Sequence, residues 1–447
     1  MNFEAIKNTI KDALAPLGVS EYEIYYMASE ETSVETLNRE INGFKSGNRG
    51  GLCLRVVLGG KLGYASTELM DEAEMRELAK RACDNARYVE KPDTVGIFAG
   101  SPKYEEFTVP QYKALDAAEL KEYAKAIGDK LFECSDKVQN GSASQAVSTG
   151  LVIRIANSHG LDLSTSCGVN AAFAEAVVKE GEEYRSAYSL KELKGKESVT
   201  EMVDEAVSNA LDKIGGGTVS SGKYNIVISP KQMRALLSVF SFAFSARQVL
   251  DGISLLRDKI GDKVAADIVT VTDDPQREGL SIGTTFDAEG VATSRKEIIG
   301  GGVLKTYLHN RETALAMGVE STANAQKADY SSPVSIMPHS FAIEAGDKSF
   351  DELLALAGEG IYLTELQGLH AGANPVTGDF SLQAAGYAIK DGKLGGYVQG
   401  FTVAGNFYTL LKEIRALGNN MELGVAMGFT TYGAPAALVC DMAVAGK

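Results

Sequence analysis

The sequence has few of the residues that most often bind metals or form covalent cross-links. Only five of its 447 residues are cysteine and only four are histidine. The cysteines are scattered, odd in number and never arranged as C-x-x-C, so neither a zinc ribbon nor a disulfide framework is expected, and a reducing cytoplasm is the natural compartment. They are Cys53, Cys83, Cys134, Cys167 and Cys440.

Clusters of basic residues and long hydrophobic runs are also missing. The chain has 44 Lys and Arg against 59 Asp and Glu, a formal net charge of −15, so no nucleic-acid partner is expected. The longest strongly apolar window, 236–246, is interrupted by serines and is shorter than the ~20 residues of a membrane-spanning helix. The stretch 1–18 has no unbroken apolar core, so neither a signal peptide nor membrane attachment is expected.

Proline is scarce, with ten residues, whereas glycine is abundant, with 47. No stiff proline-rich linker therefore divides the chain, and glycine turns between short strands are expected. At roughly 150 residues per domain, the length predicts two or three domains. The polar stretch 191–197 is the best candidate boundary, which gives one domain over 1–195 and another over 196–447.

The N-terminal part alternates between helical and strand-like patterns. Ile6, Ile10 and Leu14 form one stripe of a helix that ends near Gly18. Period-two alternation over 21–26 predicts a half-buried strand. Further strands are expected at 33–41, 52–58 and 62–66, a helix at 71–87, and a strand meander from 142 to 190. The sequence therefore predicts an α+β fold whose N-terminal domain is a layered α/β sheet.

The C-terminal part is expected to be a glycine-rich, largely antiparallel β domain of partial-barrel type. A capping box of Ser198 and Glu201 opens a helix that ends at the glycines 215–217. A second helix begins with Ser229 as N-cap and Pro230 at its first position, and its apolar stripe is core packing.

Few motifs indicate chemistry, since P-loop, G-x-S-x-G, dinucleotide-binding and H-E-x-x-H sequences do not occur. His309 and Glu312 have a spacing that can place both on one metal, although a helix-surface pair is the commoner arrangement. The pairs Asp273–Asp274 and Asp287–Glu289 could share a proton or bind a divalent ion, but turn capping is favoured. The other histidines, His159, His339 and His370, are expected in turns and loops.

Several segments, read in order, resemble the TldD/PmbA (TldE) family, historically called modulators of DNA gyrase. They include GGLCLRVV at 50–57, GYAST at 63–67, NSHGL at 157–161 and, most specifically, NPVTGDFS at 374–381. The ending MAVAG at 442–446 also fits. The resemblance covers nearly the whole chain.

The resemblance also draws attention to a missing metal site. TldD-type members resemble zinc peptidases, with two histidines and a glutamate from an H-E-x-x-x-H helix and a cysteine near the C-terminus. The corresponding positions here are SVFSFA at 238–243 and about Met427–Gly428, and Cys440 lies several residues too late. The chain is thus similar to PmbA/TldE-type members, with no catalytic, metal-binding or cofactor-binding residue of its own.

The resemblance implies a non-catalytic subunit of a cytoplasmic metallopeptidase complex that acts in proteolysis and peptide maturation. Zinc is expected in a TldD-type partner, unfolded or small peptides are the expected substrates, and a dimer is expected. Two alternatives stay open. One is an independent metal-dependent hydrolase that uses His309, Glu312 or Asp287, and the other is a non-enzymatic adaptor acting on a partner such as DNA gyrase.

Overall fold

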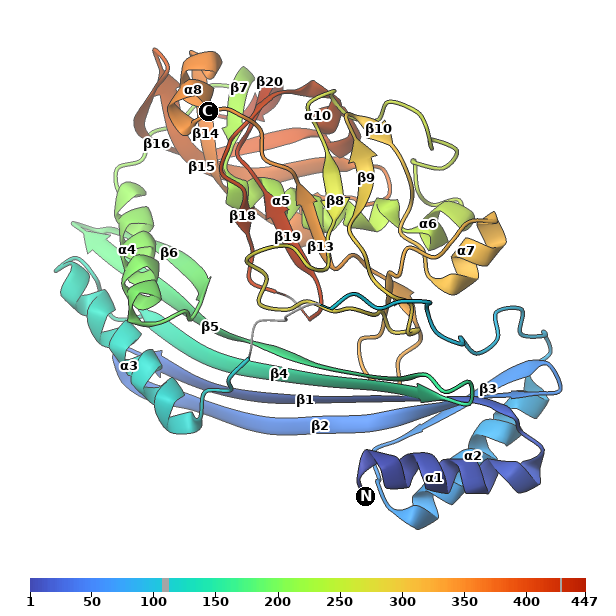
Figure 1. Cartoon of the computed structure of the whole chain (residues 1–447). Helices are drawn as coiled ribbons and strands as arrows, with labels where there is room; N and C mark the ends of the chain where they lie inside the picture. The colour runs from blue at the N-terminus through green and yellow to red at the C-terminus, as the bar shows by residue number, and fades with distance from the viewer. Residues whose placement is uncertain (107–111, 427) are drawn as a thin grey trace.

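A long, curved sheet and a more compact group of strands make up the molecule (Figure 1). The structure is a computed structural model that describes residues 1–106, 112–426 and 428–447. The N-terminal sheet runs across the lower part of the view, and the C-terminal strands lie above it. The chain therefore has the predicted α+β architecture.

The N-terminal sheet is entirely antiparallel, with the order β3-β2-β1-β4-β5-β6. The prediction of separate strands at 21–26 and 33–41 is wrong, because one strand runs from Glu21 to Leu37 and turns at Asn38 and Arg39, which have positive φ. The six strands of this N-terminal sheet are β1 (Glu21–Leu37), β2 (Glu40–Leu58), β3 (Lys61–Thr67), β4 (Ala143–Asn157), β5 (Asp162–Glu180) and β6 (Glu183–Glu192).

Where residues 23–27 of β1 lie beside residues 51–55 of β2, this sheet is buried on both faces. Ile24 and Leu54 pack against the predicted helices, observed as α1 (Phe3–Leu14) and α2 (Glu72–Tyr88). Tyr25 and Cys53 point to the opposite face and pack against Phe286 of the C-terminal region. The prediction of a half-buried strand is therefore wrong, because alternation along one strand does not reveal what covers the polar face.

The other end of the sheet carries α3 (Ala117–Cys134) and α4 (Lys196–Asp212). The N-cap of α4 is Gly195, and the Ser198 hydroxyl donates to the Gly195 carbonyl oxygen at 2.6 Å, so the predicted capping box at Ser198 is wrong. Buried α4 residues pack with β5 and β6. The boundary at 195/196 stays a prediction, and these contacts favour a position after α4.

The C-terminal region contains a closed five-stranded barrel. The sheet order β16-β15-β14-β7-β20 closes on itself because β16 also pairs with β20. Only β14 and β7 are parallel within this ring, so the predicted partial-barrel, largely antiparallel character is confirmed. The strands are β7 (Gly222–Ile228), β14 (Gly360–Gln367), β15 (Asp379–Lys390), β16 (Lys393–Asn406) and β20 (Ala437–Ala445).

A second sheet, with the order β10-β9-β8-β13-β19-β18, shares a core with this barrel. The predicted helix α5 (Pro230–Phe240) is part of the same core through Met233, Leu236 and Phe240. The strands of the second sheet are β8 (Val271–Asp273), β9 (Lys296–Gly300), β10 (Val303–Leu304), β13 (Ser340–Ile343), β18 (Glu422–Leu423) and β19 (Thr431–Ala434).

Short elements complete the described chain. They are η1 (Ala15–Leu17), η2 (Ser241–Phe244), α6 (Ala246–Leu250), α7 (Arg311–Met317), β11 (Ala325–Gln326), β12 (Ser335–Ile336), α8 (Phe350–Ala357), α9 (Leu369–Gly372), α10 (Phe407–Glu413) and β17 (Ile414–Leu417). Among all described residues, no helix combines the length and apolar character needed to cross a bilayer.

Gly63 is a site where a single methyl group would disturb the N-terminal layers. A Cβ atom there would lie 2.2 Å from the Ala82 carbonyl oxygen and 2.4 Å from the Ala86 nitrogen, both in the α2 backbone. We expect Gly63→Ala to lower the free energy of unfolding by about 1–3 kcal/mol, because α2 must move away from β3. The urea midpoint measures this loss. Gly47→Ala is the control, since its Cβ would meet nothing within 4 Å, and equal midpoints for the two variants would contradict the packing argument.

Candidate functional site

A cavity of about 850 Å³ lies between the N-terminal sheet and the C-terminal region, and is called the central cavity below. Met27 and Leu151 line it from β1 and β4, and Ser238 of α5 and Gly428 line it from the C-terminal region. It therefore joins the two positions at which the family resemblance places metal ligands, although Met427 itself lies outside the described residues. The other lining residues are Ser29, Arg49, Glu68, Thr149, Gln326, Lys327, Ala328, Asp329, Tyr330, Ser335, Met337, Phe429, Thr430 and Tyr432.

The donor groups at this position do not suit zinc. The Ser238 hydroxyl donates to the Ala235 carbonyl oxygen at 2.8 Å, and the hydroxyl oxygens of Ser241 and Tyr432 lie 2.9 Å apart. Protein zinc sites are built from thiolate, imidazole and carboxylate groups. Neither histidine nor cysteine lines the central cavity among the described residues, so the zinc that the family implies does not fit here.

His309 and Glu312 face different partners. His309 is buried, its Nδ1 atom lies 3.3 Å from the Thr313 hydroxyl oxygen, and burial lowers its pKa to about 4. Glu312 is exposed and forms a 2.6 Å ion pair with Arg247. Their spacing therefore produces neither a shared metal site nor a helix-surface pair.

The other candidate residues are also dispersed. His159 is exposed in the turn between β4 and β5, His370 is exposed in α9, and Cys440 lies on β20. His339 is buried, and its Nε2 atom donates to the Ala323 carbonyl oxygen at 2.8 Å. Across residues 1–106, 112–426 and 428–447, no three His, Cys, Asp or Glu side chains are grouped so that they could hold a metal ion.

Asp273 is the centre of a buried polar network. Its Oδ1 accepts hydrogen bonds from the backbone nitrogens of His339 and Ser340, both at 2.8 Å. Its Oδ2 lies 3.2 Å from the Lys296 ammonium group and 2.6 Å from the Asn324 amide nitrogen. Burial alone would raise the pKa of Asp273, but Lys296 and these hydrogen bonds lower it. Asp273 therefore ties β8 to β9 and β13 as an ionised group.

Asp287 caps a turn, as favoured from the sequence. Its Oδ1 accepts hydrogen bonds from the backbone nitrogens of Glu289 and Val291 at 2.9 and 3.0 Å, and its Oδ2 accepts one from Ala325 at 3.0 Å. Glu289 accepts a hydrogen bond from the Arg311 backbone nitrogen at 2.8 Å. Burial, followed by the Glu289 charge, raises the pKa of Asp287. These bonds hold the segment that covers the N-terminal sheet.

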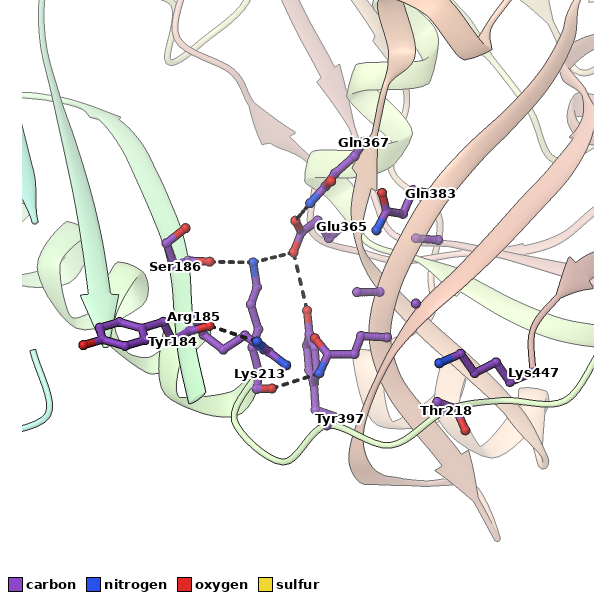
Figure 2. A pocket seen from close by; sticks show the side chains of 15 residues that line it. Tyr184, Arg185, Ser186, Lys213, Thr218, Glu365, Gln367, Gln383, Tyr397 and Lys447 are labelled. Atoms are coloured by element: carbon purple, nitrogen blue, oxygen red, sulfur yellow. Dashed lines mark hydrogen bonds and ion pairs between the residues drawn. The ribbon is translucent and has the colours of Figure 1, made fainter. Parts of the chain in front are cut away.

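A second candidate region follows strand β6, which is the last strand of its sheet. A polar cavity of about 520 Å³ separates its residues from the barrel (Figure 2). The Lys213 ammonium group crosses this gap, 2.7 Å from a Glu365 carboxylate oxygen and 2.8 Å from the Ser186 carbonyl oxygen. Tyr397 lies on the other side of Glu365, its hydroxyl 3.5 Å from the carboxylate.

Two further cavities continue along the same strand. One of about 370 Å³ is lined by β6 residues 186–188, and one of about 670 Å³ is lined by residues 190–192. We call the three cavities together the edge groove. No motif in the sequence indicates it, because it forms only where β6 faces parts of the C-terminal region that are distant in sequence, including β14, β16 and α5.

The strand register shows which backbone groups of β6 point away from its neighbour β5. The Leu193 nitrogen donates to the Asn170 carbonyl oxygen at 2.8 Å, and Glu192 pairs with Ala171. Because hydrogen-bonded and non-hydrogen-bonded pairs alternate in an antiparallel ladder, the odd-numbered residues of β6 bond to β5. The even-numbered residues, such as Ser186, therefore direct their N–H and C=O groups away from β5, consistent with the contact of Lys213.

Three models of the PmbA/TldA metallopeptidase family match this chain: domain 1 over residues 22–86, the central domain over 110–214 and the C-terminal domain over 221–446. The chain belongs to the PmbA/TldD family. The family membership predicted from the sequence segments is therefore confirmed.

Similarity to individual proteins and solved structures supports the same family membership. An uncharacterized protein of Methanocaldococcus jannaschii is 30% identical, over 90% of this chain and 93% of its own length. Metalloprotease PmbA of Escherichia coli O157:H7 is 25% identical, over 87% of this chain and 85% of its own length. A Thermotoga maritima structure with the provisional name of a DNA gyrase modulator has a TM-score of 0.88 at 29% identity, covering 99% of this chain and 100% of that one. TldE of Thermococcus kodakarensis shares the fold, with a TM-score of 0.87 at 23% identity and the same coverage.

Replacing the buried Asp273 tests whether its network is structural. We expect Asp273→Asn to destabilise the protein by about 3–5 kcal/mol, because the amide group presents donors to Lys296 and Asn324 and leaves a buried cation unpaired. A lowered carboxyl pKa stabilises the fold above the unfolded-state pKa of about 3.8, and this stabilisation is lost as the pH falls through the lower folded-state pKa. The acid-side decline in melting temperature should therefore be smaller in the variant.

The neighbouring Asp274→Asn is the matched control. Its Oδ1 accepts a hydrogen bond from the Gln276 nitrogen at 3.1 Å, which asparagine can also accept, so the melting temperature should change little. Equal losses for the two variants would show that Asp273 has no special role.

Proposed function

We propose that this chain is the zinc-less subunit of a two-subunit PmbA/TldD peptidase, and that a TldD-type partner carries the catalytic zinc. The observation that carries the proposal is the chemistry of the central cavity. Ser238 and Gly428 lie where the family resemblance places metal ligands, and neither can bind zinc as imidazole or thiolate does. A metal-bound water is the nucleophile in such peptidases, so this subunit needs a partner for hydrolysis.

In the proposed complex, this chain holds extended peptide substrate. Outward-facing N–H groups of β6, such as that of Ser186, offer main-chain hydrogen bonds that do not depend on the peptide sequence, whereas the Ser186 carbonyl oxygen already accepts one from Lys213. The edge groove leaves room beside them for side chains. This arrangement suits unfolded or small peptides, and peptide maturation in the cytoplasm is the role that we infer.

The hydrolase alternative has less support. His309, Glu312 and Asp287 are each bonded to different partners, so they do not converge on one reacting atom. The adaptor alternative rests on a historical family name, and none of the described contacts favours it over a peptidase subunit.

The first experiment compares the isolated chain with a mixture of this chain and a TldD-type partner. We expect the isolated chain to contain substoichiometric zinc and to leave an unstructured peptide intact, whereas the mixture should cleave the peptide. Metal analysis and mass spectrometry of the peptide provide the measurements.

A partner whose H-E-x-x-x-H glutamate is replaced by glutamine controls for contaminating proteases, since the mixture containing it should be inactive. Stoichiometric zinc and peptide cleavage by the lone chain would reject the proposed role. So would full activity of the partner without this chain.

The second experiment tests the edge groove. Ser186→Pro removes one outward-facing N–H from β6 but none of its bonds to β5, so the fold should be retained. We expect about a fivefold loss of affinity for an extended peptide, because one hydrogen bond contributes about 1 kcal/mol. Calorimetric titration of the complex measures the affinity. Ser186→Ala keeps the N–H and should bind like the wild type, and equal binding by the proline variant would exclude strand addition at this position.

A further inference from the structure

Lys327 is a buried lysine that forms no ion pair with any acidic residue in the described part of the chain. It follows β11, lines the central cavity and is only 8% exposed. Within the described parts of the chain, its ammonium group has no carboxylate within 4.0 Å and no hydrogen-bond acceptor. Its Nζ atom lies 4.8 Å from the centroid of the Tyr25 ring.

Such a group is unfavourable unless something else supplies the negative charge. Burial of a cation carries a desolvation penalty, and a cation–π contact offsets only part of it. Burial accordingly lowers the pKa of Lys327. Other cations with little exposure have carboxylate partners. The buried Arg277 pairs with Glu344 at 3.1 Å, and the partly buried Lys296 and Arg55 pair with Asp273 at 3.2 Å and Glu23 at 3.0 Å. Lys327 departs from this pattern, and it does so at the wall of the large central cavity.

The acidic groups near Lys327, Glu23 and Asp329, favour its charged form from a distance, but neither forms an ion pair with it in the described structure. Glu68 accepts a hydrogen bond from the Tyr330 hydroxyl at 2.7 Å, and Asp329 accepts from the backbone nitrogens of Ser331 and Ser332, both at 2.7 Å. The lining also contains a second cation, Arg49, which forms no ion pair with any described residue. Two cations that have no ion-pair partner among the described residues therefore line a space whose two carboxylates, Glu68 and Asp329, are hydrogen-bonded to neutral donors.

We propose that the central cavity binds a carboxylate group through Lys327, with Arg49 as a second cation at its rim. Met27, Leu151 and Phe429 supply apolar wall around the charged group, so the carboxylate belongs to a molecule with an apolar or neutral body. A short peptide has this chemistry, and its carboxylate can be the chain end or an acidic side chain. The inference goes beyond the proposed subunit role, because it requires neither a partner nor zinc.

The test uses the full chain alone and calorimetric titration with three probes. They are acetyl-Ala-Ala-Ala with a free C-terminus, acetyl-Ala-Ala-Ala-amide, and acetyl-Ala-Asp-Ala-amide. We expect at least one of the two acidic peptides to bind, and the neutral amide to bind at least tenfold more weakly. Binding of only the first acidic peptide assigns the chain end, and binding of only the second assigns the side chain.

Lys327→Met keeps an unbranched side chain but removes the charge, and should abolish this preference for the acidic peptides. Its melting temperature should equal or exceed that of the wild type, since an unpaired buried cation is removed. Lys393→Met, at an exposed position without an ion pair in the described structure, is the control and should bind like the wild type.

Several results would overturn the proposal. They are equal binding of acidic and neutral peptides, undiminished binding by folded Lys327→Met, or no binding of any probe at millimolar concentration. Inorganic phosphate is a further probe. If it binds as tightly as the peptides and depends equally on Lys327, the site recognises anions in general and the proposed preference for carboxylates is wrong. If Lys327→Met does not fold, Lys327→Arg must retain the preference, because it retains the charge.

Discussion

The contact between the curved N-terminal sheet and the C-terminal region determines the rest of the molecule. Tyr25 and Cys53 on the sheet pack against Phe286 and Ala288, so apolar side chains form most of this interface. The buried ion pair of Glu23 and Arg55 lies on the same face of the sheet. Where the two surfaces separate, the central cavity opens between them, and its walls therefore come from both regions.

The same arrangement explains the edge groove. Strand β6 ends the sheet opposite the barrel, and Lys213 connects the two by contacting Ser186 and Glu365. A sheet edge is normally a liability, because its unpaired backbone groups can join another chain. Here the barrel limits access to one side of that edge.

Local sequence patterns predicted the helices and strands that are specified by residues close together in the sequence. The apolar stripes of α2 and α5 identified both helices, and the glycine turns between short strands predicted the barrel character of the C-terminal region. The helix α3 was missed although it begins with a capping box of Asp116 and Glu119. The burial of Glu23 and the separation of His309 from Glu312 depend on segments distant in sequence, so no window of residues could reveal them. Lys327 had no distinguishing pattern at all, because a missing partner is visible only in three dimensions.

The closure of the barrel has a consequence for how the protein acquires its shape during synthesis. Strand β7 leaves the ribosome long before β20, which pairs with it on one side and with β16 on the other. All six strands of the N-terminal sheet precede β7 in the chain, so this layer can assemble first. Until β20 emerges, the edge of β7 that pairs with it lacks its partner strand, and the barrel cannot close.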